Sequence, residues 1–195
     1  MRPDTFVRRL LKAEPQAVTR VMAFMSYNPA IGRVLQGGGV KKFERVATQL
    51  IRGLPRVRSQ RDFDRLHSRF VRRILKTFRT SRGGRPSFGQ AAKPINVFLK
   101  LYVDWASRPD PRTSQRVVRF LHVPLDSVLM GKIKARYPVW YDREIRPHVR
   151  GEAFPHSLSL VDREVYWKWQ RYFRARWPKK PLLFDIAWAI YREAS

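Results

Sequence analysis

Apolar residues recur every three or four positions between Arg61 and Phe78, and this periodicity constrains the fold more than any other feature. The pattern predicts an amphipathic helix that needs an apolar body against its inner face. The outer face of this helix is expected to be basic. The apolar positions are Phe63, Leu66, Phe70, Val71, Ile74, Leu75 and Phe78, and the basic ones are Arg65, Arg69, Arg72, Arg73 and Lys76.

A second predicted helix is apolar on nearly every side and is therefore expected to lie at the centre of the molecule. It follows the loop 81–86 and contains Ile95, Val97, Phe98, Leu99, Leu101, Tyr102, Val103 and Trp105. We expect Lys93 to open this helix and Pro94 to occupy its first turn, where a missing backbone donor does no harm.

Further helices are expected along the rest of the chain, where proline and glycine separate short periodic segments. No segment shows convincing strand alternation, so we predict an all-α, compact, single domain over residues 1–195. The other expected helices are 6–11, 16–25, 40–51, 114–121, 127–133, a helix with apolar residues every four positions from Val165 to Trp177, and 182–192, whereas 137–141 is expected to be a loop.

The charge of the chain points to a polyanionic partner. Its 195 residues include 41 Lys+Arg against 15 Asp+Glu, a net charge of +26, yet 44% are hydrophobic and 13% aromatic. Such a chain folds, so its excess charge lies on a surface and repels itself unless a polyanion neutralises it. Nucleic acid is the leading candidate. A ribosome-associated or membrane-surface protein is the alternative.

Composition also excludes several classes of chemistry. Cysteine is absent, which removes disulfides, thiol catalysis and an iron–sulfur cluster. The four histidines, at 67, 122, 148 and 156, lack metal-ligand spacing, so we expect neither metal nor cofactor. No run of about 18 apolar residues is present to span a membrane. We read the basic N-terminus as part of the fold and expect a cytoplasmic, nucleoid-associated protein.

A lysine and an aspartate stand out as a reactive pair. Burial at a helix start would lower the pKa of Lys93 and leave its amine nucleophilic. The turn of Val123, Pro124 and Leu125 delivers Asp126, whose carboxylate can stabilise positive charge on a sugar or activate water. The same carboxylate suits an N-cap for the helix at Ser127, and both roles are compatible.

The motifs around this pair resemble the helix-hairpin-helix DNA glycosylase superfamily over about 75 residues. Gly89-x-x-x-Lys93-x-x-Asn96-Val97-x-Leu99 looks like the second hairpin helix of that family, and the segment His122 to Ser127 looks like its Pro-and-Asp loop. Asp126 follows Lys93 by 33 residues (126 − 93), a spacing similar to that in archaeal 8-oxoguanine glycosylases. The usual Gly-x-Gly is replaced by Ser87-Phe88-Gly89-Gln90-Ala91, and Pro94 directly after the lysine is unusual.

The resemblance implies a monomeric enzyme that binds double-stranded DNA, flips out a damaged or modified base and excises it. Its core spans about 61–135, followed by aromatic-rich helices over 137–195. Lys93 would attack C1′, with strand cleavage as a possible sequel, in base-excision repair or in defence against modified phage DNA. The expected base pocket is Trp140, Tyr141, Phe88 and Trp105. The expected DNA contacts are Arg69, Arg72, Arg73, Lys76, Arg82, Arg85, Gly89 and Gln90.

Two other functions are compatible with the same sequence. A basic helical protein that packages or bridges nucleic acid would bind without releasing bases. The pattern Arg143-x-x-x-x-His148 has the spacing seen in small all-α ribonuclease toxins, although such matches arise by chance in a chain this rich in arginine.

Overall fold

The computed structural model describes residues 3–36, 39–149 and 157–185, with side chains from residue 13 onward. Within these ranges the chain is helical, and strand-like pairing is limited to an isolated bridge between Leu35 and Thr80. The predicted all-α class is confirmed. The α-helices are α1 (Pro3–Ile31), α2 (Gly39–Ile51), α3 (Gln60–Thr77), α4 (Phe88–Leu99), α5 (Pro111–Val117), α6 (Ser127–Arg136), α7 (Pro138–Glu144) and α8 (Arg163–Arg176).

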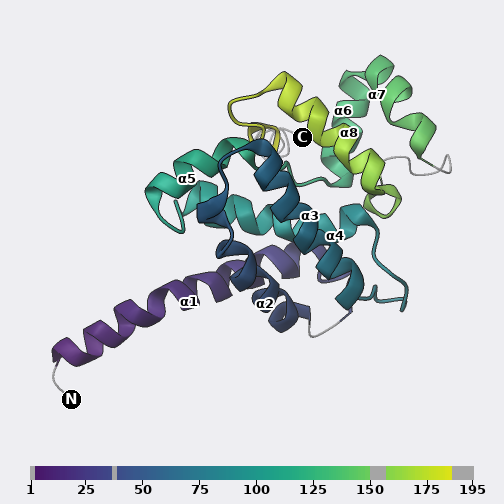
Figure 1. Ribbon diagram of the computed structural model, residues 1–195. Helices are drawn as coiled ribbons and strands as arrows, with labels where there is room; N and C mark the ends of the chain where they lie inside the picture. Colours follow the sequence, from purple (N-terminus) through teal and green to yellow (C-terminus); the bar gives the residue numbers. More distant parts are fainter. Residues whose placement is uncertain (1–2, 37–38, 150–156, 186–195) are drawn as a thin grey trace.

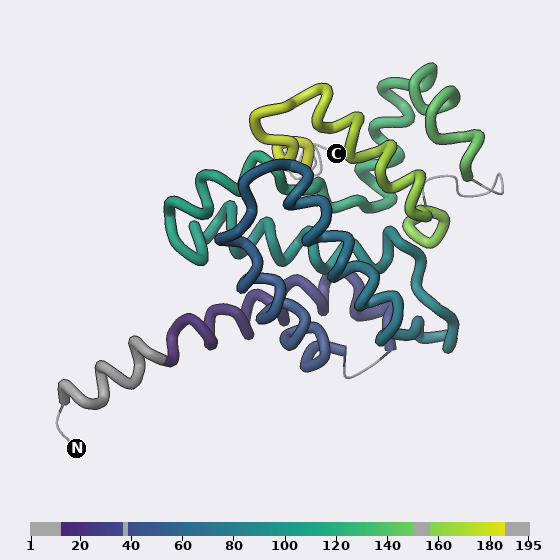
Figure 2. Tube along the Cα trace, viewed as in Figure 1, coloured from purple at the N-terminus to yellow at the C-terminus, as the bar shows by residue number. Residues whose placement is uncertain are grey.

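Short helical segments join these elements. They are the 3₁₀ turns η1 (Leu54–Arg56), η3 (Val118–Phe120), η4 (Arg146–His148) and η5 (Leu158–Leu160), and the π-helix η2 (Lys100–Trp105). Figure 2 allows the path to be followed from α1, through the α2–α3 pair and the central α4, to α8.

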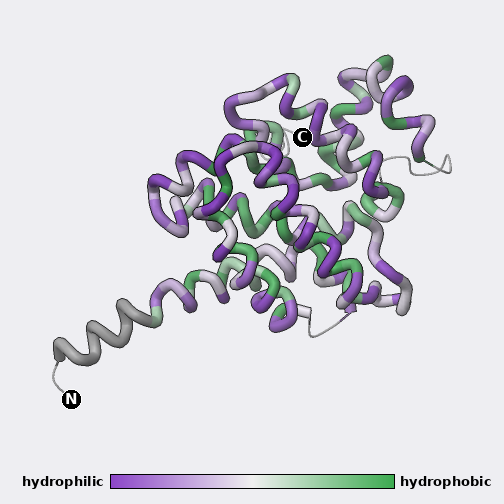
Figure 3. The backbone as a smooth tube through the Cα atoms, in the orientation of Figure 1, coloured by the Kyte–Doolittle hydropathy of each residue, from purple (hydrophilic) through white to green (hydrophobic). Residues whose placement is uncertain are grey.

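Helix α4 lies at the centre of the fold, where α1, α3, η5 and α8 all contact it (Figure 1). Its buried side chains include Ile95, Phe98 and Leu99, as the apolar sequence predicts. Figure 3 shows hydrophobic segments gathered around this helix and hydrophilic ones on the outer turns of α3. The sequence correctly identified both the central helix and its basic neighbour.

The start of α4 differs from the prediction. A capping box fixes it, because Ser87 Oγ accepts a hydrogen bond from the Gln90 amide and Gln90 Oε1 accepts one from the Ser87 amide. The helix therefore begins at Phe88, so Lys93 and Pro94 lie in its second turn, inside the helix. The expected dipole effect at a helix start is lost for Lys93, since that effect fades beyond the first turn.

Two other boundaries were predicted wrongly. Helix α1 is a single helix that contains Pro15 and Pro29, which were expected to divide it. One proline removes one backbone donor, and the rest of the helix tolerates that loss. Of residues 137–141, Tyr137 caps α6 and α7, and 138–141 form the start of α7 with Pro138 at its first helical position, so this segment is not a loop. The predicted helix 182–192 is described only to Asp185, and the rest lies outside the described residues, as does His156.

Candidate active site and nucleic-acid interface

Lys93 and Asp126 belong to one cluster of charges, which we call the Lys93 cluster: Lys93, Lys100, Asp126 and Asp185. Burial lowers the pKa of Lys93, and the nearby charges of Asp126 and Asp185 act against that shift. Burial also raises the pKa of Asp185, opposed by the Lys100 ammonium, whose Nζ lies 2.5 Å from Asp185 Oδ2. Two lysines and two carboxylates therefore influence one another through their charges, and Asp126 lies near enough to Lys93 to act on its pKa.

Asp126 occupies the helix N-cap position predicted for it. It precedes α6 with an extended backbone, and its Oδ1 accepts a hydrogen bond of 2.8 Å from the Leu129 amide. The aspartate is thus a helix N-cap, and this interpretation is confirmed. Its side chain remains half-buried and its charge acts on Lys93 and Asp185.

The turn that carries Asp126 is clamped to the helix that carries Lys93. Both backbone polar groups of Val123 bind Gln170: the Val123 amide donates to Oε1 and the Val123 carbonyl accepts from Nε2, each at 2.9 Å. Asn96 Nδ2 also donates to the Val123 carbonyl at 3.3 Å. Since Asn96 lies one helical turn from Lys93, α4 and α8 together fix the turn of Asp126 relative to the lysine.

A buried polar chain continues from this clamp. His67 Nε2 lies 2.8 Å from Asn96 Oδ1, Asn96 Nδ2 donates to Tyr166 Oη at 2.9 Å, and Tyr166 Oη lies 2.8 Å from His122 Nδ1. His122 Nε2 then lies 2.9 Å from Asp64 Oδ1. With both histidines neutral and protonated on Nε2, donation runs in one direction along the chain, with Tyr166 donating to His122 Nδ1. Arg174 Nη2 also lies 2.6 Å from His122 Nε2 and competes with the proton on that nitrogen.

The charges at the end of this chain favour a neutral His122. Burial lowers the pKa of His122 to about 4, although the hydrogen bond with Asp64 acts in the opposite direction. Burial raises the pKa of Asp64, but hydrogen bonding to His122 and the charge of Arg174 outweigh burial and bring the pKa to about 2. Arg174 neutralises this carboxylate with donors 2.9 and 3.2 Å from its two oxygens. Sequence reasoning missed this network because its five members come from four segments far apart in the chain, with Asp64 and His67 sharing α3.

The π-helix η2 places one aromatic residue beside the Lys93 cluster. Trp105 follows Lys100 by five positions, an offset that places two side chains on different sides of an α-helix but on similar sides of a π-helix. Lys100 Nζ accordingly lies 5.0 Å from the centre of the Trp105 ring, whose residue is 62% exposed. Of the four residues expected to form a base pocket, Trp105 is the one linked to the cluster.

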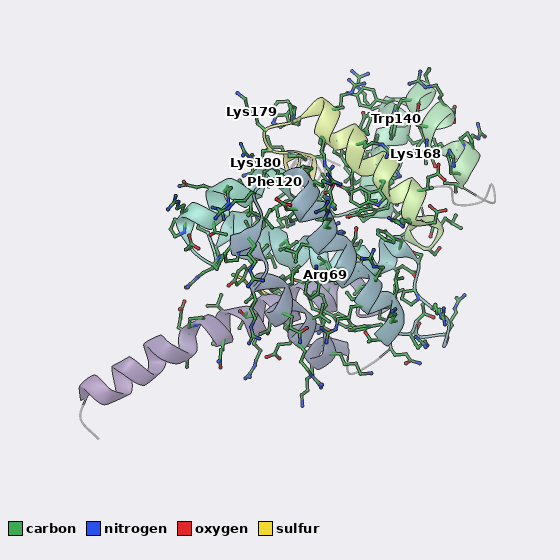
Figure 4. The ribbon with its side chains drawn as sticks, in the orientation of Figure 1. Arg69, Phe120, Trp140, Lys168, Lys179 and Lys180 are labelled. Atoms are coloured by element: carbon green, nitrogen blue, oxygen red, sulfur yellow. The ribbon has the colours of Figure 1, made fainter. Side chains whose placement is uncertain are left out.

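The other three aromatic residues lie elsewhere. Tyr141 is buried in the core, and Phe88 packs on Tyr166 with ring centres 5.0 Å apart. Trp140 packs against Tyr172 with ring centres 3.9 Å apart. Trp140 and Lys168, both labelled in Figure 4, line a cavity of about 300 Å³. That cavity has no lining residue from the Lys93 cluster, so the structure does not join these aromatics to the lysine in one site.

The residues expected to contact DNA divide into three groups. Arg69, Arg72, Lys76, Arg82 and Arg85 are exposed, as such contacts require. Arg73 is half-buried and donates to Gln49 Oε1 on α2. Gly89 and Gln90 are the third group, and their backbone amides have other partners.

The expected phosphate grip by the Gly89 and Gln90 amides does not fit this geometry. The Gly89 amide donates to the Val161 carbonyl at 2.8 Å, and the Gln90 amide donates to Ser87 Oγ at 3.1 Å. A Cβ on Gly89 would lie 2.7 Å from Val161 Cβ, so η5 and its following residue cover this position. The glycine is required here for close packing, and a phosphate cannot reach either amide without displacing these contacts.

The ribonuclease-like pair makes separate contacts. Arg143 Nε pairs with Glu144 at 3.0 Å, and His148 Nδ1 pairs with Glu164 at 3.3 Å. Across the described ranges, no group of three or more His, Asp or Glu side chains forms a possible metal site. No helix in the described part of the chain is long and apolar enough to cross a membrane.

Comparison with known proteins adds no further assignment: no protein-family model matches the chain, and neither a curated protein nor a solved structure matches it.

Proposed function

We propose that the protein is a DNA glycosylase in which Lys93 and Asp126 are the reacting pair. The observation that carries this proposal is the pairing itself: a half-buried lysine with a lowered pKa lies within the electrostatic influence of an aspartate that a rigid turn presents. Burial favours the neutral amine that a nucleophile requires, whereas the Asp126 charge opposes that shift, and a pKa perturbed by burial beside a charged partner is typical of a reactive centre.

The chemistry begins with the neutral Lys93 amine. Its nitrogen forms a bond to C1′ of the target nucleotide while the bond from C1′ to the base breaks, and the electron pair leaves with the base, which takes up a proton. The Asp126 carboxylate stabilises the positive charge that develops on the sugar. Loss of a proton and ring opening then give a Schiff base on Lys93, from which β-elimination can cleave the strand.

Asp185 extends this proposal to a residue that the sequence did not indicate. Its carboxylate binds Lys100, so the Lys100 ammonium neutralises much of the negative charge of Asp185, and the Asp126 carboxylate acts on Lys93 through its charge. The signal available in the sequence was weak: Asp185 is a lone acid after the apolar residues Leu182, Leu183 and Phe184.

Duplex DNA with a flipped base is the proposed substrate form, bound by a monomer in the cytoplasm. The net charge of +26 supports binding to a polyanion. Trp105 is the proposed stacking surface for the flipped base, because it combines high exposure with contact to the cluster through Lys100.

The test measures base release from duplexes that carry oxidised, deaminated, alkylated or phage-type modified bases. Asp126→Asn retains a good N-cap and removes the charge, so it should abolish release while the fold is maintained. Asp110→Asn is the matched control, since Asp110 caps α5 in the same way and lies outside the Lys93 cluster. A phage-type substrate would indicate defence, whereas an oxidised or alkylated one would indicate repair.

Binding without release on every duplex would contradict the proposal and leave a basic nucleic-acid-binding protein. Release that survives Asp126→Asn would also contradict it. Cleavage of RNA that is lost in His148→Ala would instead favour a ribonuclease.

A further inference from the structure

A basic groove lies along the outer face of α3, apart from the Lys93 cluster. Its volume is about 740 Å³, and Arg69, labelled in Figure 4, is one of its lining residues. We define the arginine groove by the six residues that carry the argument: Arg61, Arg65, Arg69, Arg72, Arg163 and Trp167. None of them belongs to the Lys93 cluster.

The arginines of this groove are available to a ligand. Arg61, Arg69, Arg72 and Arg163 are exposed and form no ion pair with any residue that the structure describes. Four uncompensated guanidinium groups side by side repel one another, so an anion would stabilise this arrangement.

The acidic residue in the lining, Asp64, does not offset these charges. Two nitrogens of Arg174 bind its oxygens at 2.9 and 3.2 Å, and Gln60 Nε2 donates to it at 2.8 Å. Its carboxylate is thus already satisfied from inside the protein. The groove therefore presents a net positive surface to a ligand.

The spacing along α3 suits a chain of regularly repeated anions. Arg61, Arg65 and Arg69 follow one another at intervals of four residues, which corresponds to about 6 Å along the helix axis for each step. Successive phosphates along an extended nucleic-acid strand are separated by a comparable distance. Guanidinium groups also bind phosphate through two parallel hydrogen bonds.

Trp167 adds a surface for a base. It is half-buried, and its ring stands nearly perpendicular to those of His122 and Tyr166, with ring centres 5.2 and 5.6 Å away. These buried neighbours fix its orientation while it lines the groove beside Arg163. A rigid aromatic ring next to phosphate-binding arginines is the combination that single-stranded nucleic acid uses.

We propose that the arginine groove binds a single nucleic-acid strand, with phosphates on the arginines of α3 and one unpaired base stacked on Trp167. A flat anionic membrane or a carboxylate-rich peptide would use the charge but would not require the ring. The site is independent of the proposed glycosylase chemistry, so Asp126→Asn should bind a strand with unchanged affinity.

The test uses fluorescence anisotropy with a labelled single-stranded oligonucleotide of about ten nucleotides, a length within the usual site sizes. Arg65→Gln/Arg69→Gln should reduce the slope of log affinity against log salt by about 1.4, since each lost phosphate contact removes about 0.7. Lys41→Gln/Arg45→Gln is the matched control, because these exposed residues of α2 have the same four-residue spacing and charge. The control should leave the slope nearly unchanged.

The stacking contact is tested separately. Trp167→Leu should weaken strand binding on the order of tenfold or more, whereas Trp167→Tyr should retain most of the affinity. Thermal unfolding shows whether each variant is folded, and Trp167→Tyr keeps the test informative if Trp167→Leu is not. An oligonucleotide that consists of abasic sites has no base to stack on Trp167. Its affinity for the wild type should therefore equal the affinity of the full strand for Trp167→Leu.

Three results would overturn the proposal. The first is an equal change of the salt slope in the α2 and α3 double variants. The second is equal affinity of the wild type for the abasic oligomer and for the strand. The third is a duplex that binds as tightly as the strand and loses the same affinity in Trp167→Leu. Strand binding by the wild type without base release from any duplex of the panel would contradict only the proposed glycosylase function.

Discussion

The buried histidine His122 should make the protein less stable as the pH falls from about 6.5 to 4. Its pKa is about 4 in the folded state, against an ordinary value of 6.5. Within that interval the unfolded chain binds one more proton than the folded one, so stability increases with pH. Integrated over the interval, this amounts to ~3 kcal/mol of unfolding free energy at ~1.4 kcal/mol per pH unit. His67, whose pKa burial also lowers, adds in the same direction.

Other groups act outside this window or against it. The lowered pKa of Asp64, about 2, contributes stability that is lost only below the ordinary value of 3.8. Asp185 has the opposite sign, because its raised pKa lets the folded state take up a proton first. The slope attributable to His122 is therefore best measured as a difference between the wild type and His122→Gln.

Urea unfolding measures that difference. It is carried out in steps of about half a pH unit from about pH 4.5 to about pH 7, which covers most of the interval in which His122 is expected to titrate. The slope of unfolding free energy against pH should be smaller in His122→Gln than in the wild type by up to ~1.4 kcal/mol per pH unit. His148→Gln, at a half-buried histidine outside the buried chain, is the control. Equal slopes in the wild type and His122→Gln would refute the neutral, proton-donating His122 on which the buried chain depends.

Three further predictions concern the clamp, the glycine and the lysine. Gln170→Leu should lower the unfolding free energy by about 2–3 kcal/mol in urea titration, because it leaves the buried Val123 amide without a partner. Gly89→Ala should lower it by about 1–3 kcal/mol, since the new Cβ would lie 2.7 Å from Val161 Cβ. Schiff-base formation by Lys93 should increase with pH and reach half its maximum below the pKa of an exposed lysine, which single-turnover borohydride trapping at stepped pH measures.

Each of these predictions has a control. Gln115→Leu, at an exposed position, and Gly84→Ala, where a Cβ would approach nothing closer than 3.5 Å, should change the unfolding free energy by less than about 0.5 kcal/mol. If Gln170→Leu and Gly89→Ala lower the unfolding free energy no more than these controls do, the packing described is contradicted. If the pH at which trapping reaches half its maximum equals the pKa of an exposed lysine, the conclusion that Lys93 is desolvated is contradicted.

Local patterns in the sequence predicted most of the fold. The apolar residues of α3 recur with a clear helical period, and α4 is apolar all round, so both helices and their burial followed from periodicity. The start of α4 did not follow, because the capping box of Ser87 and Gln90 decides it and periodicity carries no information on caps. Pro15 likewise divided α1 in the prediction but not in the molecule.

The candidate site was predictable only in part. Lys93 and Asp126 were chosen from spacing and turn chemistry, and the charge of Asp126 acts on the pKa of Lys93. Asp185, the Val123 clamp and Trp167 were not found, since each depends on contacts between segments far apart in the chain. Trp140 and Tyr141 were chosen on the expectation of a loop, and their place in α7 removes that reason.

The most direct test of the central claim is to trap the protein on a duplex with an abasic site using borohydride and to map the adduct by mass spectrometry of peptides. This substrate needs no knowledge of which base is removed. Our account predicts one dominant adduct, on Lys93, that disappears in Lys93→Gln, decreases strongly in Asp126→Asn and persists in Asp110→Asn. Adducts spread over exposed lysines and unchanged by these substitutions would contradict it.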